Sequence, residues 1–378
     1  MAPSEWQFNY HLELVGLAFL AVIFPFVRKL LDFSYSRHLD TKERSYSVDF
    51  VKGLAMTGIV IIHVDSYFHY FHPHDGSVWT RVLANLSRFS VPAFIISAGM
   101  FISWKDEGKN YWSSKITGIL IPYLILSAVG YFLKYPKADG WVLDLGERLF
   151  WGRVFQPYYF VPLLFGFYIL FALVLRKLSL SNPRTTAVLL AGSLLLNFLS
   201  NHFLSKKTDL LMKIENISFT NFIFFFCLGL LAKKTLTDKK RIQAVFRSQA
   251  SRVFPLFFLL LYVGYIIYQT FRWEHGISNH LLFYPMIAAL MLYRLGFYLE
   301  EKESFFPKSV FRTFAYIGKN SLGVFLIHPI LIHLMHSFDP HDMKGAFIGW
   351  WSAFLLNLTV PLLIWWAVGK ILGLFKKK

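Results

Sequence analysis

The 378-residue chain lacks most of the features on which soluble and secreted proteins depend. It has one cysteine, Cys227, which excludes a disulfide framework and a metal site built from several thiolates. Only 16% of its residues are charged, and the polar intervals, at most about twenty residues long, are too short for a separate soluble domain. These absences exclude a disulfide-rich secreted domain and an ordinary soluble enzyme.

Apolar residues dominate the chain instead. Hydrophobic residues make up 55% of it and aromatic residues 19%, and the mean hydropathy is +0.46. This composition predicts an all-α protein, a polytopic membrane helical bundle of about eleven transmembrane helices. The net charge of +17 comes from basic residues in short loops between apolar runs. Such a distribution indicates topology signals and contact with anionic membrane lipids, so we expect no nucleic-acid partner.

The expected membrane helices are apolar runs that are long enough to cross a bilayer. They lie at about 11–30, 48–70, 82–104, 116–133, 155–175, 185–204, 216–232, 253–271, 279–297, 316–338 and 347–372. Basic residues follow the first run rather than precede it, which is the reverse of a signal peptide, so we expect this run to be retained.

The distribution of basic residues predicts the topology. If the 28–47 loop is cytoplasmic, the cytoplasmic segments hold more than twice as many Lys and Arg as the opposite side. This asymmetry predicts an N-terminus outside and a C-terminus in the cytoplasm. We therefore expect a multi-pass protein of the bacterial cytoplasmic (inner) membrane.

Lys52 and His63 are the first candidate functional residues, because ionisable side chains are costly inside a membrane helix. Eleven helical steps end some 20° past three full turns, so the two residues share one face, roughly 16 Å apart along the axis. Asp49 lies near the same face. A structural interpretation stays open, in which Lys52 extends to the headgroups and His63 makes a hydrogen bond to a neighbouring helix.

Further candidates lie near the ends of other runs. Arg88 is suited either to anchoring a substrate or to pairing with a carboxylate such as Asp65. Lys115 fits a phosphate contact or an ordinary cytoplasmic anchor. Tyr158 and Tyr159 fit an aromatic belt or a polyol site. Each of these alternatives stays open from the residues alone.

The penultimate run adds Ser321 and His328, which are seven residues apart and therefore share a face. Pro329 frees a backbone carbonyl one turn earlier, next to His328. His63, His72 and His74 do not make a convincing metal site, because no ligand spacing accompanies them. We expect no metal.

Five motifs in order resemble the membrane acyltransferases called acyltransferase family three. The first is Lys52, ten residues, then His63, in RSYSVDFVKGLAMTGIVIIH, where the family more often has arginine in place of the lysine. The others are SVPAFIISAGMFIS, KITGILIPYL, PYYFVPLLFGFYIL and IGKNSLGVFLIHPIL. The family core has ten helices. The resemblance therefore divides the chain into an N-terminal transmembrane helix with a cytoplasmic loop, 1–47, and an acyltransferase-like ten-helix domain, 48–378.

The resemblance implies transfer of an acyl group, often acetyl, from cytoplasmic acyl-coenzyme A to hydroxyls of surface glycans. Acyl-coenzyme A would be the donor substrate, and a glycan or glycolipid acceptor and membrane lipids would be the other partners. Acyl transfer needs a base or an acyl carrier and donors for the oxyanion. For His63 we expect the role of base or acyl carrier. Lys52 and Asp49 complete the catalytic group: Lys52 would neutralise phosphate of the donor, and Asp49 would either orient Lys52 or contact the polar portion of the donor.

Substrate binding is expected at Arg88, Lys115, Tyr158, Tyr159, Ser321 and His328. Among these, Arg88, Ser321 and His328 are the candidates for acceptor binding or oxyanion stabilisation. The alternative function is a non-enzymatic exporter or flippase of a polysaccharide. The two halves of the chain show none of the self-similarity common in transporters, which favours the enzyme.

Overall fold

The computed structural model describes residues 46–72, 77–102, 108–135, 140–178, 180, 182–203, 217–236, 250–273, 282–301, 305–337, 346–371 and 373. The apolar run at 11–30 and nearly all of the 1–47 segment lie outside these residues. The expected N-terminal helix therefore stays a prediction.

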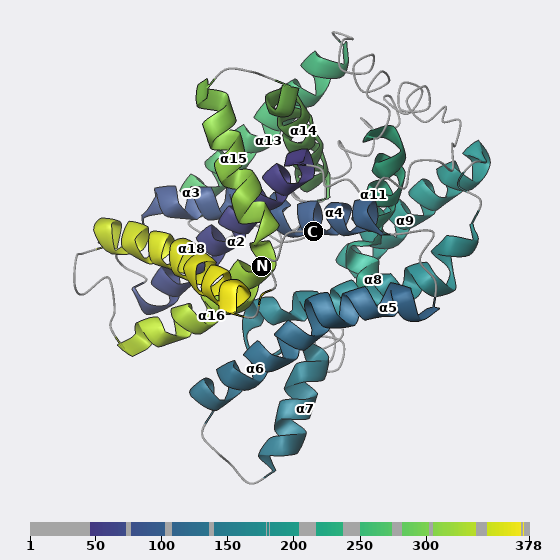
Figure 1. The fold of residues 1–378 in the computed structure, drawn as a ribbon. Helices are drawn as coiled ribbons and strands as arrows, with labels where there is room; N and C mark the ends of the chain where they lie inside the picture. Colours follow the sequence, from purple (N-terminus) through teal and green to yellow (C-terminus); the bar gives the residue numbers. More distant parts are fainter. Residues whose placement is uncertain are drawn as a thin grey trace.

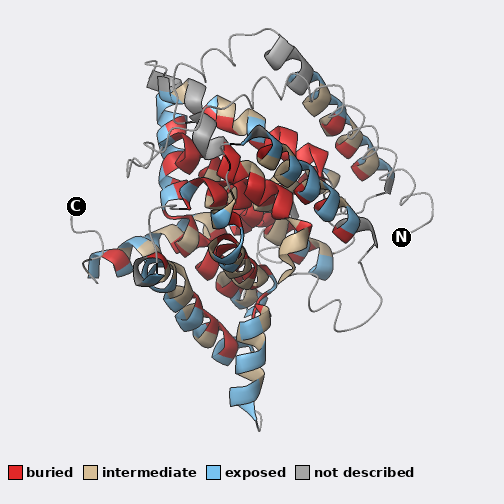
Figure 2. Ribbon diagram, turned by 90° about the vertical axis from the view of Figure 1, so that its right-hand side faces the viewer, coloured by how far each residue is buried: buried red, intermediate tan, exposed pale blue. Residues whose placement is uncertain are grey.

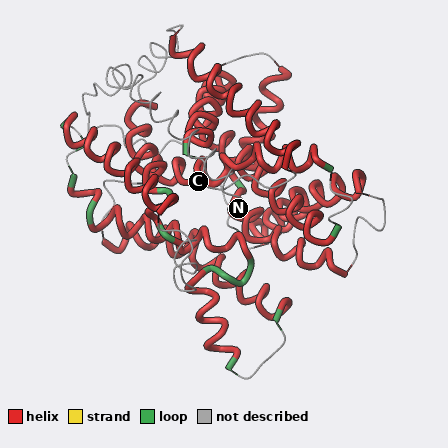
Figure 3. The backbone as a smooth tube through the Cα atoms, turned by 180° about the vertical axis from the view of Figure 1, so that it is seen from behind, coloured by secondary structure: helices red, strands yellow, loops and turns green. Residues whose placement is uncertain are grey.

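Every element in the described ranges is helical, which confirms the all-α prediction (Figure 3). The helices are α2 (Tyr46–Phe71), α3 (Val78–Leu86), α4 (Ser90–Phe101), α5 (Gly108–Lys115), α6 (Ile121–Lys134), α7 (Trp141–Trp151), α8 (Phe160–Leu173), α9 (Pro183–Phe203), α11 (Ile223–Leu236), α13 (Ala250–Trp273), α14 (Phe283–Glu301), α15 (Phe305–Lys319), α16 (Ser321–Leu334) and α18 (Ala346–Ile371). Short turns of 3-10 or π-helix adjoin several of them: η1 (Ser87–Phe89), η2 (Ile116–Leu120), η3 (Gln156–Tyr159), η4 (Leu175–Lys177), η5 (Phe219–Asn221) and η6 (Met335–Ser337).

The outer helices present large apolar side chains to their surroundings, as expected in a membrane. Val188 on α9, Leu260 on α13 and Leu363 on α18 are all exposed, whereas buried residues gather in the middle of the bundle (Figure 2). Five described helical segments are long and apolar enough to cross a bilayer, or six if one bent helix pair counts as a span. Three shorter apolar helices accompany them. The protein is therefore a membrane protein, but the described residues do not confirm the predicted number of eleven spans.

Helix α2 lies at the centre of the bundle and packs against α15, α4, α14, α16, α18 and α3 (Figure 1). Its closest crossing is with α15, where two glycines face backbone. A Cβ on Gly53 would overlap the carbonyl of Phe314, and one on Gly318 would overlap the carbonyl of Asp49. Small residues allow such close backbone approach between membrane helices. This crossing determines where the Asp49–Lys52 turn of α2 lies.

The run predicted at 316–338 is two helices rather than one. α15 and α16 meet at Asn320 with a bend of 73°. Asn320 leaves the helical conformation, with φ −105° and ψ 14°, and its side-chain amide donates to the Tyr316 carbonyl at 2.9 Å. The bond satisfies a carbonyl at the end of α15, as a helix end requires. The bend places Ser321 at the first turn of α16, against the bundle interior.

Helix α7 is an element that the hydropathy pattern does not predict. It runs between Gly140 and Gly152, which have φ values of 79° and 63° and suit a chain reversal. Asp144 accepts hydrogen bonds from Tyr131 on α6, at 2.8 Å, and from Arg148, at 2.8 and 2.9 Å. The bond from Arg148, and then that from Tyr131, lowers the pKa of the Asp144 carboxyl below its usual value. The charged Asp144 thus fastens α7 to α6 at neutral pH.

Candidate functional site

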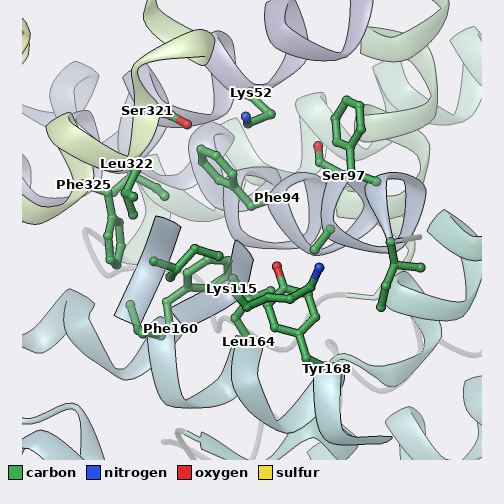
Figure 4. Close-up of a pocket in the computed structure, with 16 residues that line it drawn as sticks. Lys52, Phe94, Ser97, Lys115, Phe160, Leu164, Tyr168, Ser321, Leu322 and Phe325 are labelled. Carbon is green, nitrogen blue, oxygen red and sulfur yellow. The ribbon is translucent and has the colours of Figure 1, made fainter. Parts of the chain in front are cut away.

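A cavity of about 250 Å³ opens between α2, α4, η2, α8 and α16. Most of its wall is apolar and aromatic. Two lysines enter it from different elements, Lys52 from α2 and Lys115 from the end of α5 (Figure 4). An apolar cavity with a few convergent polar groups is typical of a small-molecule site.

Lys52 belongs to the central helix and is paired with Asp49. Its Nζ lies 3.7 Å from Asp49 Oδ1, three residues earlier on the same helix. The Asp49 side chain is only 3% exposed, whereas that of Lys52 is 22% exposed. A buried carboxylate needs such a partner. The pair therefore aims a partly solvated ammonium group into the cavity.

Lys115 is held by two tyrosine rings. Its Nζ lies 4.5 Å from the ring centroid of Tyr111 and 5.3 Å from that of Tyr168, within the range of cation–π attraction. The Tyr111 hydroxyl donates to the Tyr168 carbonyl at 3.0 Å, which fixes one ring against α8. Lys115 thus lies at the cavity wall rather than extending away from the bundle.

His63 and His328 come together from α2 and α16, with ring centroids 5.5 Å apart. His63 follows the cavity residue Ile59 by one helical turn, and His328 follows the cavity residue Phe325 by three residues. The histidine pair therefore adjoins the cavity without lining it.

Three phenylalanines link the cavity to this pair. The ring centroids of Phe94 and Phe160 are 6.1 Å apart, and those of Phe160 and Phe325 are 5.7 Å apart. Phe325 in turn lies 6.3 Å from the His328 ring. All three phenylalanines line the cavity. The three rings therefore form a continuous aromatic contact from the cavity to His328.

Arg88 lies near the histidine pair. It interacts electrostatically with His63, Tyr159 and Asp65. Asp65 forms an ion pair with another arginine, Arg81, whose Nε is 3.0 Å from Asp65 Oδ2. Both arginines thus lie near one buried carboxylate, that of Asp65. The contact with Asp65 and the expected contact of Arg88 with a substrate are compatible.

The two tyrosines of η3 have different environments. Tyr158 is fully buried and donates from its hydroxyl to the Leu326 carbonyl at 2.5 Å. A membrane-surface belt does not explain a tyrosine in that place, and Tyr158 instead anchors α16. Tyr159 is partly buried near Arg88. Ser321 lines the cavity on the side of Lys52 (Figure 4).

The structure therefore brings most of the predicted residues into one region. Lys52, Lys115 and Ser321 line the cavity, Asp49 supports Lys52, and His63, His328, Arg88 and Tyr159 lie beyond the phenylalanines. The catalytic and binding roles assigned to them stay predictions. Sequence reasoning missed Phe94, Phe160 and Phe325. The only indication in the sequence was that these phenylalanines lie within the family motifs. Aromatic residues are common in membrane helices, so their presence alone does not indicate a site.

Comparisons with known proteins identify the chain at the level of a family. A family model described as an acyltransferase domain, that of acyltransferase family three, matches residues 45–368. The match begins just before α2, ends within α18 and includes every candidate residue named above. No curated protein and no solved structure matches the chain. Within the described ranges, no three His, Cys, Asp or Glu residues are grouped so that they would hold a metal ion.

Proposed function

Because the chain belongs to acyltransferase family three, we propose that it is a membrane-embedded O-acyltransferase. It moves an acyl group, acetyl in the simplest case, from cytoplasmic acyl-coenzyme A to a hydroxyl of a surface glycan or glycolipid. The observation that carries this proposal is the cavity between Lys52 and Lys115, which ends one helical turn from the His63–His328 pair.

The cavity matches the chemistry of a coenzyme A thioester. The donor has phosphates at one end and a thin, largely apolar arm that carries the acyl group at the other. Lys52 and Lys115 supply positive charge for the phosphates, since ammonium groups bind phosphate as point charges. The apolar wall formed by Ile59, Leu164 and the phenylalanines accommodates the arm.

The histidine pair supplies the reactive groups. A neutral imidazole presents a lone pair that can accept a proton or attack an acyl carbon, which makes His63 suitable as a base or as an acyl carrier. Arg88 interacts electrostatically with His63 and is suited to stabilising the developing oxyanion. In this proposal the acceptor approaches from the side of Tyr159 and Arg88, which interact electrostatically with each other.

We further propose that the protein is a multi-pass protein of the bacterial inner membrane, with its N-terminus outside and its C-terminus in the cytoplasm. In that orientation the first turn of α2 and Lys115 lie on the cytoplasmic side. This is the side on which acyl-coenzyme A is available. The charge asymmetry of the loops supports the orientation.

Release of free coenzyme A tests the function. Purified protein in lipid is supplied with acetyl-coenzyme A and a crude glycan extract. Wild type is compared with His63→Ala and with the control His69→Ala, a histidine of the same helix outside the proposed site. We expect glycan-dependent release by wild type and His69→Ala, and a loss of about 100-fold or more for His63→Ala. Absence of release with any acyl donor, while His63→Ala still blocks the appearance of glycan at the cell surface, would favour an exporter.

A further inference from the structure

His328 holds a ring nitrogen that is buried and has no hydrogen-bond partner in the described part of the chain. The residue is 0% exposed, and its Nε2 atom makes no hydrogen bond. Buried polar atoms are nearly always hydrogen-bonded, so an exception in the middle of a membrane bundle calls for an explanation. A transient partner that arrives with the substrate is one such explanation.

The other ring nitrogen decides the chemical state of Nε2. His328 Nδ1 lies 2.8 Å from the Val324 carbonyl oxygen, which only accepts hydrogen bonds. In a neutral imidazole one nitrogen carries the proton and the other a lone pair. Nδ1 therefore carries the proton, and Nε2 presents a lone pair. Pro329 adds to this arrangement, because its missing N–H frees the Phe325 carbonyl, which also interacts with the ring.

Neighbouring elements hold this lone pair in one position. Tyr158 donates to the Leu326 carbonyl at 2.5 Å, and Phe160 packs against Phe325. On the opposite side, a Cβ on Gly323 would overlap the Trp365 ring of α18. His328 is thus a preorganised proton acceptor, and preorganisation is what a catalytic base requires.

We propose that His328 is the general base that deprotonates the acceptor hydroxyl through Nε2, and that the adjacent His63 carries the acyl group. This division of roles rests on the acyltransferase function proposed above. The ring centroids of the two histidines are 5.5 Å apart, so one acceptor hydroxyl bound between them can contact both rings and relay the proton.

The reaction balances in two steps. First, a nitrogen of His63 attacks the thioester carbon, the C–S bond breaks, and the proton of His63 leaves with the thiolate as a thiol. Second, the acceptor hydroxyl gives its proton to His328 Nε2 and its oxygen bonds to the acyl carbon. The bond from that carbon to His63 then breaks, and His328 returns the proton to the nitrogen that His63 regains. Both histidines end neutral, and the products are an ester and a thiol.

The amount of thiol released per protein, without and with acceptor, distinguishes the role of His328 from that of His63. Protein in lipid is mixed rapidly with acetyl-coenzyme A, first without acceptor and then with the crude glycan extract, and free thiol is measured. The variants are His63→Ala, His328→Gln and the control His333→Ala, a histidine of the same helix that contacts Phe155 rather than the pair. Glutamine keeps an N–H for the Val324 carbonyl but provides no basic nitrogen.

We expect His328→Gln to release about one thiol per protein and then stop, with glycan turnover at least about 100-fold below wild type. His63→Ala should lose both the first release and turnover, and His333→Ala should retain both. Turnover by His328→Gln within threefold of wild type would overturn the inference. So would a folded His328→Gln that lacks the first release, because a base for the second step is not needed in the first.

A second variant, His328→Ala, is judged by the same criteria if His328→Gln does not fold. The failure of the inference is distinct from the failure of the proposed function. A wild-type protein that releases no thiol overturns both, whereas a wild type that turns over beside an equally active His328→Gln overturns only the assignment of the base.

Discussion

The ionisable residues inside this bundle differ in how their charge or proton is held. Lys52 is held by the carboxylate of Asp49, and Lys115 by two tyrosine rings. His328 has its proton fixed by a backbone carbonyl. Lys52 and Lys115 line the cavity, and the His328 ring lies beside that of His63.

Lys52→Met removes an ammonium group from the cavity but keeps most of the length of the side chain. If the group contacts the phosphates of the donor, KM for acetyl-coenzyme A rises by about tenfold or more, because a charge-assisted hydrogen bond contributes about 1.5–3 kcal/mol. The measurement is the initial rate of thiol release against donor concentration. Lys177→Met, an exposed lysine that does not line the cavity, is the control. Equal KM values for both variants would show that Lys52 does not contact the donor.

At the scale of the helices, the crossings with α2 determine where the cavity residues lie. The α2–α15 crossing brings Gly318 onto the Asp49 carbonyl, one turn before Lys52 enters the cavity. The break between α15 and α16 then directs α16 along the cavity, so that Ser321 and Phe325 line it and His328 reaches His63. The contact of Gly318 with α2 and the non-helical conformation of Asn320 thus bring residues of α16 next to residues of α2.

Gly318→Ala tests the importance of this crossing. The added methyl group would overlap the Asp49 carbonyl, which belongs to backbone that cannot rotate away. We expect a loss of about 1–3 kcal/mol in stability, the usual cost of overpacking, and a lower midpoint of thermal unfolding in detergent. The matched control is Gly192→Ala on α9, where nothing lies within 4 Å of the new Cβ. Equal unfolding midpoints for the two variants would contradict the close crossing.

On the scale of the whole molecule, the proposed function requires one particular orientation in the membrane. The basic residues of the loops predict that Lys177 faces the cytoplasm. Helix α7 precedes the candidate span Gln156–Lys177 and is therefore expected on the opposite side. The proposed function depends on this orientation, because it requires a cytoplasmic donor and an acceptor on the opposite side of the membrane.

Cysteine labelling in intact cells measures the orientation. The chain has one cysteine, Cys227, which is buried, so Cys227→Ser provides a cysteine-free background. Single cysteines are then introduced as Glu147→Cys on α7 and Lys177→Cys after α8, both exposed positions. A membrane-impermeant maleimide is expected to label the first in intact cells and the second only after permeabilisation. The reverse pattern would place the lysine end of the cavity outside and overturn the orientation.

The amino-acid sequence is enough to establish what depends on local geometry and composition. Apolar runs predict membrane helices because backbone groups in lipid must be satisfied within the segment, and helical spacing places Lys52 and His63 on one face. The five motifs identify the family. Tertiary structure alone decided which faces meet. It showed that His63 lies beside His328, that Phe94, Phe160 and Phe325 join the cavity to this pair, and that the 316–338 run bends at Asn320. These contacts depend on how distant helices pack, and hydropathy and residue spacing describe each helix without its neighbours.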